Sequence, residues 1–316
     1  MPGFDVVVVG SFMQDLVARV PHWPRPGETV LASEFGLFQG GKGGNQAIAA
    51  ARAGARVAMI GRLGADVFGD SCLRNLAAEG IADGGIVRDG EEGTGIAIPI
   101  LNPLGENMII VAPRANMRLS VDDVQAAAGV IGAGRVLLLQ METPLAASLA
   151  AARLARAAGA AVVWNVAPAA PLPHNAFALC TVMVVNEGEA ATLTGADTSS
   201  FEGCRAAARA FRERGAGSAI VTLGAGGVLW ADAAGEGSLP AHTVKVVDST
   251  GAGDAFCGAL AAALARGEPL ARVIASGNAA GALAVGKLGA AASLPRADEI
   301  AALLAETGMN ESGRYT

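Results

Sequence analysis

Short runs of Val, Ile and Leu alternate along the chain with alanine-rich segments of helical periodicity, and this alternation constrains the fold more than any other feature. Near the start "VVVVG" precedes "NQAIAAARAG", and further along "VMVVN" precedes "EAATLTG" and "AIVTLG". Strands that are apolar on both faces and separated by helices form parallel sheets covered by helices. The predicted fold class is therefore α/β, with a doubly wound, mainly parallel sheet and helices on both faces.

Two segments interrupt this alternation, at about residues 15–38 and 93–116. They contain short strands and Pro-Gly turns but no helical period, so we expect them to pair as a small β-sheet that covers the site as a lid. A length of 316 residues suits one substantial core with such an appendage. The predicted organisation is a single domain over residues 1–316.

The composition narrows the classes of partner. The formal net charge is -6, without a basic stripe, which argues against nucleic acid and anionic membrane surfaces and favours small-molecule ligands. The N-terminal residues show neither a secretion signal nor an apolar run long enough for a membrane helix. Four cysteines lack metal-ligand spacing, so we expect buried thiols in a reducing cytoplasm: Cys72, Cys180, Cys204 and Cys257.

The stretch "GLFQGGKGGNQ" nearly matches a phosphate-binding P-loop. Gly36, four residues, Gly41 and Lys42 fit the pattern, but Gly43 stands where Ser or Thr should bind Mg²⁺. The stretch also follows one of the irregular β-segments instead of a core strand. A dinucleotide site is disfavoured as well, because the first strand ends in one glycine where the fingerprint needs three.

The most informative motif is "VKVVDSTGAGDAFCGALAAALARG", residues 244–267. A predicted strand ends at Asp248, a turn of Gly251, Ala252 and Gly253 follows, and Asp254 opens an alanine-rich helix. Such a turn points backbone N–H groups at an anion, for example a phosphoryl group in transfer. Asp254 beside it could accept the proton of an attacking hydroxyl. A plain turn, in which the Asp complements the helix dipole, would give the same pattern.

The segments "DSTGAGDAF" and "GGKGGNQAIAAARAGA" resemble the two signature regions of the ribokinase, or PfkB, family of sugar kinases, in order and separation. Counterparts extend over essentially the whole chain, among them "GSFMQDL", "PGETV", "LLLQMETP", "VVNEGEA", "VTLGAGGV" and "KLGAAASLP". The resemblance implies an ATP-dependent kinase that phosphorylates the primary hydroxyl (O5) of a pentose, D-ribose or 2-deoxy-D-ribose. It also implies Mg²⁺ or a similar divalent cation, K⁺ as activator, and a homodimer formed through the lid sheet.

The resemblance assigns roles to individual residues. Asp254 is the implied base, and Gly251, Ala252 and Gly253 form the implied anion hole. Carboxylates and amides suit vicinal hydroxyls, and glycines let the backbone approach the sugar. The implied sugar-binding set is Met13, Asp15, Gly41, Lys42, Asn45, Glu142 and Asp254.

The same resemblance implies the nucleotide and cation sites. Asn186 and Glu189 would position Mg²⁺ and the phosphates through waters, although N-x-x-E is also a common helix cap. The implied adenine and ribose loop is Thr222, Leu223, Gly224, Ala225, Gly226 and Gly227, with Gly253 near the phosphates and Asn278 near the base. The implied monovalent-cation loop, mostly backbone carbonyls, is Asp248, Thr250, Ala284, Lys287, Gly289 and Ser293.

One departure bears on the substrate. Ribokinases typically carry Asn two residues before the sugar-binding Asp, where this chain has Met13, a side chain that cannot donate a hydrogen bond. Related 2-deoxyribokinases carry Met there. The hypothesis is that 2-deoxy-D-ribose is used as well as, or better than, D-ribose, because an apolar contact does not demand a hydroxyl. The alternative is that Met13 packs under the lid and ribose still binds.

Three other functions remain open from the sequence. A nucleoside kinase would need stacking surface, for which Trp23, Phe35 and Phe38 are candidates. Ketohexose or ketodeoxygluconate kinases remain possible, but "GGKGGNQ" and "QMETP" look closer to ribokinase. A sugar-binding regulator without catalysis is disfavoured, because Asp254 and its glycine turn are intact.

Overall fold

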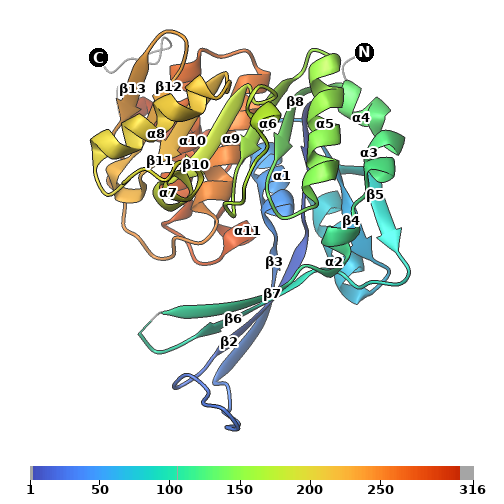
Figure 1. Ribbon diagram of the computed structural model, residues 1–316. Helices are drawn as coiled ribbons and strands as arrows, with labels where there is room; N and C mark the ends of the chain where they lie inside the picture. The colour runs from blue at the N-terminus through green and yellow to red at the C-terminus, as the bar shows by residue number, and fades with distance from the viewer. Residues whose placement is uncertain (1–2, 105, 307–316) are drawn as a thin grey trace.

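The computed structural model describes residues 3–104 and 106–306, which contain two β-sheets (Figure 1). The larger sheet has nine strands within the described ranges. In spatial order these are β13 (Glu236–Leu239), β12 (Val228–Ala231), β11 (Ser218–Thr222), β10 (Val182–Asn186), β9 (Ala161–Asn165), β8 (Gly134–Leu139), β1 (Phe4–Val9), β4 (Val57–Gly64) and β5 (Ala82–Asp89).

The strands from β11 to β5 pair in parallel, and β12 and β13 extend the sheet as an antiparallel edge. The central strands are buried on both faces, as in Val6–Val9, because helices cover both sides of the sheet. The predicted α/β class with a mainly parallel sheet is confirmed.

The helices pack in two layers, each with its own buried cluster against one face of the large sheet. One layer contains α1 (Lys42–Arg52), α2 (Val67–Ala78), α9 (Ala252–Ala265), α10 (Leu270–Ala284) and α12 (Ala297–Glu306). The other contains α3 (Val121–Ala126), α4 (Ala128–Gly132), α5 (Leu145–Ala157), α6 (His174–Phe177), α7 (Glu187–Thr194) and α8 (Phe201–Glu213). Three short helical segments complete the list: η1 (Arg114–Arg118), η2 (Gly224–Gly226) and α11 (Ala290–Ser293).

Helices α1 and α9 approach each other closely at Gly258. A Cβ atom built on Gly258 would lie 2.4 Å from the Ala49 Cβ, 2.7 Å from the Ala50 nitrogen and 2.8 Å from the Gln46 oxygen. Only glycine fits at such backbone distances. The contact holds the N-terminal half of α1, which carries Asn45 and Gln46, against the N-terminal half of α9, which carries Asp254.

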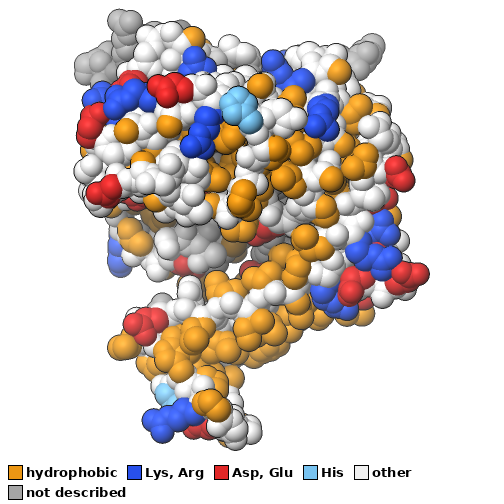
Figure 2. Space-filling model, viewed as in Figure 1, with side chains coloured by type: hydrophobic (Ala, Val, Ile, Leu, Met, Phe, Trp, Pro, Cys, Tyr) orange, Lys and Arg blue, Asp and Glu red, His pale blue; other side chains and the backbone are white. Residues whose placement is uncertain are grey.

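The smaller sheet projects from one end of the molecule (Figure 1). Its order is β3 (Glu34–Gly40), β2 (Met13–Arg19), β6 (Ile96–Leu101) and β7 (Asn107–Ala112). The β2/β3 and β6/β7 pairs are antiparallel, whereas β2 and β6 are parallel. Apolar side chains gather over this sheet in Figure 2, and those that are exposed include Phe35, Leu37, Met108, Ile109, Ile110 and Val111.

Candidate active site

Asp254 is buried in the first turn of α9, and two amides of α1 hold its carboxylate. Asn45 Nδ2 donates to Oδ2 at 2.9 Å, and Gln46 Nε2 donates to Oδ1 at 3.0 Å. Gly251 caps the helix with a φ of 83°, in the left-handed region that favours glycine. The N–H groups of Gly253 and Asp254 have no acceptor among the described residues, so the helix begins with donors free for an anion.

A cation lies in the same cluster. Burial raises the pKa of Asp254. The charge of Lys42 and the hydrogen bonds from Gln46 and Asn45 lower this pKa, but burial outweighs them and the pKa is raised overall. Burial lowers the pKa of Lys42, but Asp254, Glu142 and Glu189 outweigh that effect and raise it. Lys42 therefore stays charged beside the carboxylate of Asp254 and can also neutralise a phosphoryl group.

Glu142 follows β8 and is held through one of its two oxygens. Its Oε2 accepts from the Ser11 hydroxyl and, at 2.9 Å, from the Lys42 backbone N–H. No donor to Oε1 exists among the residues that the structure describes, so this oxygen can accept from a sugar hydroxyl. Asp15, on β2, is close enough to Glu142 and Asp254 for their charges to act on it. Burial first, and then these two carboxylates, raise its pKa to about 6.

Asn45 has one amide atom to spare. Its Oδ1 is buried and finds no partner within residues 3–104 and 106–306. A buried carbonyl oxygen without a donor is costly unless a ligand supplies one. The implied sugar-binding residues Asp15, Lys42, Asn45 and Glu142 thus lie around Asp254.

Met13 is buried where β2 begins, opposite Gly40 of β3. The Nδ2 atom of Asn116, in η1, lies 3.7 Å from the Met13 sulfur and also donates to the Phe12 carbonyl at 2.7 Å. Asn116 is itself fully buried. The thioether is therefore packed by a neighbouring amide, and Met13 is a fixed part of the wall next to Asp15.

Asn186 and Glu189 form a capping box at the start of α7, which the sequence pattern also allowed. The Glu189 N–H donates to Asn186 Oδ1, and the Asn186 N–H donates to Glu189 Oε2, both at 2.8 Å. Both residues nevertheless line a cavity of about 230 Å³ together with Lys42, Gly251 and Asp254. Burial raises the pKa of Glu189, whereas the Asn186 N–H and Lys42 lower it, and the net direction is upward.

The implied nucleotide residues extend from this cavity along the carboxyl ends of the parallel strands. Thr222, the last residue of β11, lines the cavity, and Leu223 to Gly227 follow through the short helix η2. Asn278, on α10, does not line the cavity; its Nδ2 donates to the Pro240 carbonyl at 2.8 Å. This hydrogen bond links α10 to the segment that follows β13.

The implied cation residues come from two loops that meet at Asp248. Its Oδ1 accepts from the Thr250 N–H at 2.9 Å and hydroxyl at 2.7 Å, and its Oδ2 accepts from the Gly289 N–H at 2.9 Å. Burial raises the pKa of Asp248, but the hydrogen bonds from these donors lower it by more, so the pKa is lowered overall. Ala284 ends α10 and Ser293 ends α11, while the Lys287 ammonium pairs with Glu299. No cluster of three or more His, Cys, Asp or Glu ligands exists in the described part of the chain.

Steric contacts explain why "GLFQGGKGGNQ" has Gly43 where a P-loop has Ser or Thr. A Cβ on Gly43 would lie 2.4 Å from the Ser11 nitrogen and 2.6 Å from the Gly10 carbonyl carbon, so Ser or Thr cannot fit there. The loop ends β3 of the small sheet and begins α1, and it brings Lys42 and Asn45 to Asp254. Its near-match to a P-loop therefore does not mark the nucleotide site.

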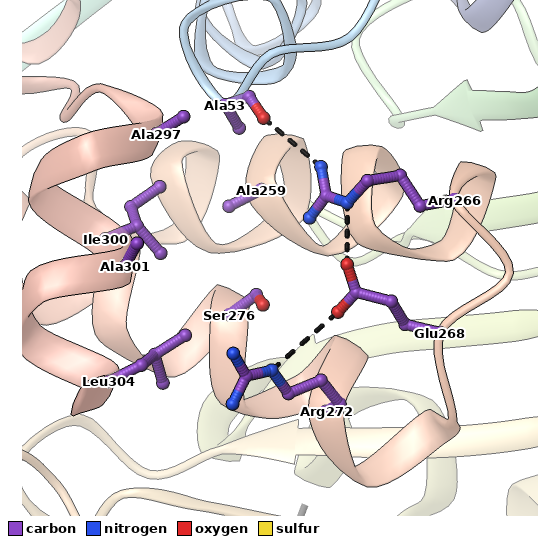
Figure 3. A pocket seen from close by; sticks show the side chains of 10 residues that line it. All are labelled: Ala53, Ala259, Arg266, Glu268, Arg272, Ser276, Ala297, Ile300, Ala301 and Leu304. Atoms are coloured by element: carbon purple, nitrogen blue, oxygen red, sulfur yellow. Dashed lines mark hydrogen bonds and ion pairs between the residues drawn. The ribbon is translucent and has the colours of Figure 1, made fainter. Parts of the chain in front are cut away.

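A second hollow of about 220 Å³ lies between α1, α9, α10 and α12 (Figure 3). It contains Arg266, Glu268 and Arg272, with Glu268 paired to both arginines. None of the implied site residues lines it.

Sequence reasoning missed several polar residues at the site: Asn165, which lines the cavity, and Ser11, Gln46 and Gln140 behind it. Ser11 and Gln46 stand beside implied site residues in "GSFMQD" and "GKGGNQ". Gln140 and Asn165 lie at or just after the ends of strands, in "VLLLQ" and "VVWN". Polar residues at the carboxyl ends of parallel strands mark the functional edge of such sheets, which is the signal that could have found them.

The pfkB family carbohydrate kinase model matches residues 4–297. The chain belongs to the pfkB family of carbohydrate kinases. It is 40% identical to the ribokinase of Mus musculus over 82% of this chain and 81% of the relative. It is 36% identical to the deoxyribokinase of Salmonella typhi, with 81% and 84% covered. The Arabidopsis thaliana ribokinase complexed with ribose and ATP superposes with a TM-score of 0.88 at 30% identity, over 95% of this chain and 98% of that one.

Family membership makes the chain an ATP-dependent sugar phosphotransferase. The described helices include none with the length and apolar character needed to cross a membrane. All four cysteines are buried free thiols, as predicted.

Proposed function

We propose that this kinase transfers the γ-phosphoryl group of ATP to the primary hydroxyl (O5) of a pentose, with Asp254 as the base. One observation supports the proposal: the Asp254 carboxylate shares the first turn of α9 with the open N–H groups, accepts from Asn45 and lies near Asp15 and Glu142, which are implied to bind the sugar. A general base needs this position, with the acceptor hydroxyl on one side and the phosphoryl group on the other.

The reaction follows from these positions. Asp15 and Glu142 Oε1 bind sugar hydroxyls beside Asn45 and direct the primary hydroxyl toward Asp254. Asp254 takes the hydroxyl proton as the new O–P bond forms, and the bond to the β-phosphate oxygen breaks with its electron pair leaving on ADP. The N–H groups of Gly253 and Asp254, together with Lys42, stabilise the charge on the transferring oxygens.

Asn186 and Glu189 fit a divalent cation bound with the nucleotide phosphates, because both line the cavity of about 230 Å³ beside Asp254, here called the phosphate cavity, with oxygen-bearing side chains. Their capping box favours binding through waters, since each already satisfies a backbone N–H. Mg²⁺ bound there would neutralise phosphate charge. We further propose that K⁺ binds the loops around Asp248; comparison of rates in K⁺ and in Na⁺ tests this.

For the sugar, we propose that 2-deoxy-D-ribose is accepted at least as well as D-ribose. The support is Met13, whose sulfur is packed by Asn116 and offers no donor to a hydroxyl. Relatives named ribokinase and deoxyribokinase are both similar to this chain. The test is kcat/KM on the two sugars for the wild type and for Met13→Asn. A wild-type preference for ribose above about a hundredfold would contradict the proposal.

A coupled ATP-consumption assay over pentoses, hexoses and nucleosides tests the kinase proposal as a whole. Asp254→Asn is the control, because it keeps the shape of the side chain and removes the base. We expect activity on a pentose and a loss of at least about a thousandfold in the variant. Equal activity of the two proteins would show that Asp254 is not the base.

The small sheet is proposed to act as a lid and to form a homodimer. Side chains alternate across a strand, so Leu16, Leu37, Ile98 and Ile110 share one face of this sheet, whereas Asp15 lies on the other. Exposed apolar surface of this kind marks an interaction site, and a second sheet of the same kind would cover it. Light scattering of the wild type and of Ile110→Asp tests the dimer. The buried free thiols support a cytoplasmic location.

A further inference from the structure

A chain of buried amides lies behind the proposed base. The Gln46 side chain, fully buried on α1, makes three hydrogen bonds. Its Nε2 donates to Asp254 Oδ1 and to Asn165 Oδ1, each at 3.0 Å, and its Oε1 accepts from Gln140 Nε2 at 2.7 Å. All the hydrogen-bonding atoms of this amide are therefore engaged by groups from α9, β9 and the end of β8.

A backbone carbonyl at the far end of this row of amides fixes which atom of each amide donates and which accepts. Asn165 Nδ2 donates to the Val184 carbonyl of β10 at 3.2 Å. Because a carbonyl can only accept, Asn165 must turn its Nδ2 toward it and its Oδ1 toward Gln46. Gln46 must then present its NH₂ group, and the second hydrogen of that group points at Asp254. Gln46 can donate to Asp254 but cannot accept from it.

We propose that Gln46 is a positioning residue for phosphoryl transfer: it holds Asp254 Oδ1 permanently as an acceptor and directs the hydroxyl proton to Oδ2. A protonated Oδ1 would face the locked NH₂ group of Gln46 with no acceptor to meet it. Oδ2 faces Asn45, whose Oδ1 has no partner among the described residues and whose amide is thus not locked. The proposal rests on the proposed role of Asp254.

Gln46 also favours the ionised form of the base, because its donor binds the carboxylate more strongly than the carboxylic acid. The other titratable groups that act on Asp254, or on which it acts, come from four elements: Lys42 on α1, Glu142 after β8, Asp15 on β2 and Cys257 on α9. Only Lys42 among these opposes the effect of burial on the pKa of Asp254. Loss of the Gln46 donor should therefore raise that pKa further.

The test is Gln46→Met, which keeps the length of the side chain and removes both donors. We expect kcat at saturating sugar to fall about 10 to 100-fold at pH 7, and the acidic limb of the kcat profile to move up by about 1 to 2 pH units. The KM for ATP should stay within about twofold, because Gln46 does not line the phosphate cavity. Gln125→Met, an exposed position on α3, is the matched control.

A second variant protects the test against a folding defect. Gln140→Met leaves Gln46 in place but removes the donor to its Oε1, so we expect a smaller shift of the acidic limb in the same direction. Asp254→Asn in the same assay separates the two proposals. If Asp254→Asn is as active as the wild type, the assignment of the base is wrong and the role of Gln46 fails with it. If Asp254→Asn is inactive while both glutamine variants keep the wild-type pH profile, only the positioning role is wrong.

Discussion

Asp15→Asn should stabilise the ligand-free protein while damaging its activity. The folded-state pKa of Asp15 is raised to about 6 from the ordinary value of 3.8, first by burial and then by the charges of Glu142 and Asp254. The folded protein therefore binds this proton more tightly than the unfolded chain does. The wild type loses stability as the pH rises from about 4 to about 6, and the full loss is present above that range.

The size of the effect follows from the same pKa. Each pKa unit corresponds to about 1.36 kcal/mol. Ionisation of Asp15 therefore lowers the free energy of unfolding by up to about 3 kcal/mol at pH 8 and by about 1 kcal/mol at pH 4.5. Asn has the same shape without the charge, and the Asp15 side chain has no hydrogen bond with the described residues that the substitution would break. For a protein of this length, about 3 kcal/mol corresponds to roughly 4 °C in the melting temperature.

The assay is thermal or urea unfolding of the sugar-free protein at pH 4.5, 6 and 8, with Asp83→Asn as an exposed control on β5. Asp15→Asn should be more stable than the wild type at pH 8, and the difference should shrink toward pH 4.5. In the kinase assay it should lower kcat/KM for the sugar about 10 to 100-fold, through loss of a charged hydrogen-bond acceptor. The reasoning would be refuted if Asp15→Asn were no more stable than the wild type at pH 8, or if the difference in stability between the two proteins did not change with pH.

Three further predictions rest on close contacts in the site. Gly258→Ala places a methyl group against Ala49 and the Gln46 backbone, so it should lower stability by about 1 to 3 kcal/mol and reduce kcat, measured by urea unfolding and turnover. Gly43→Ser, which would complete the P-loop pattern, should abolish activity because its side chain meets the Ser11 backbone; increased nucleotide affinity would argue against this account. Glu142→Gln should raise the KM for the sugar about tenfold or more while leaving the KM for ATP within about twofold.

Most of the fold was predictable, because strands buried on both faces and amphipathic alanine-rich helices leave a local pattern. The segments without helical period are the ones that form the small sheet, with β2 and β3 from the first and β6 and β7 from the second. The parallel pairing of β2 with β6 joins residues about eighty positions apart, and no local pattern reports such a register.

Site residues could be predicted from the sequence only where they stand inside one of the signature motifs. Asp254 and Asn45 stand in recognisable segments, whereas Gln140 and Asn165 act through contacts across 94 and 119 residues of chain. The spacing of Asn186 and Glu189 could not decide between a helix cap and a phosphate-facing pair, because both have the same pattern; the structure shows the capping box and places both residues at the cavity beside Asp254. Side-chain contacts between distant strands decide such cases, and a single sequence does not contain them.

The two connections between the body and the β2–β3 hairpin meet where Gly10 and Ser11 touch Gly43, and the Gly44 N–H donates to the Ser11 carbonyl at 2.9 Å. If the small sheet closes as the proposed lid, this crossing would act as its hinge, because only the residues beyond it could bend. Asn45 lies on the body side of the crossing, on α1, and Asp15 lies on the hairpin side, on β2. A sugar bound between the two residues would then have an affinity that depends on how far the lid is closed.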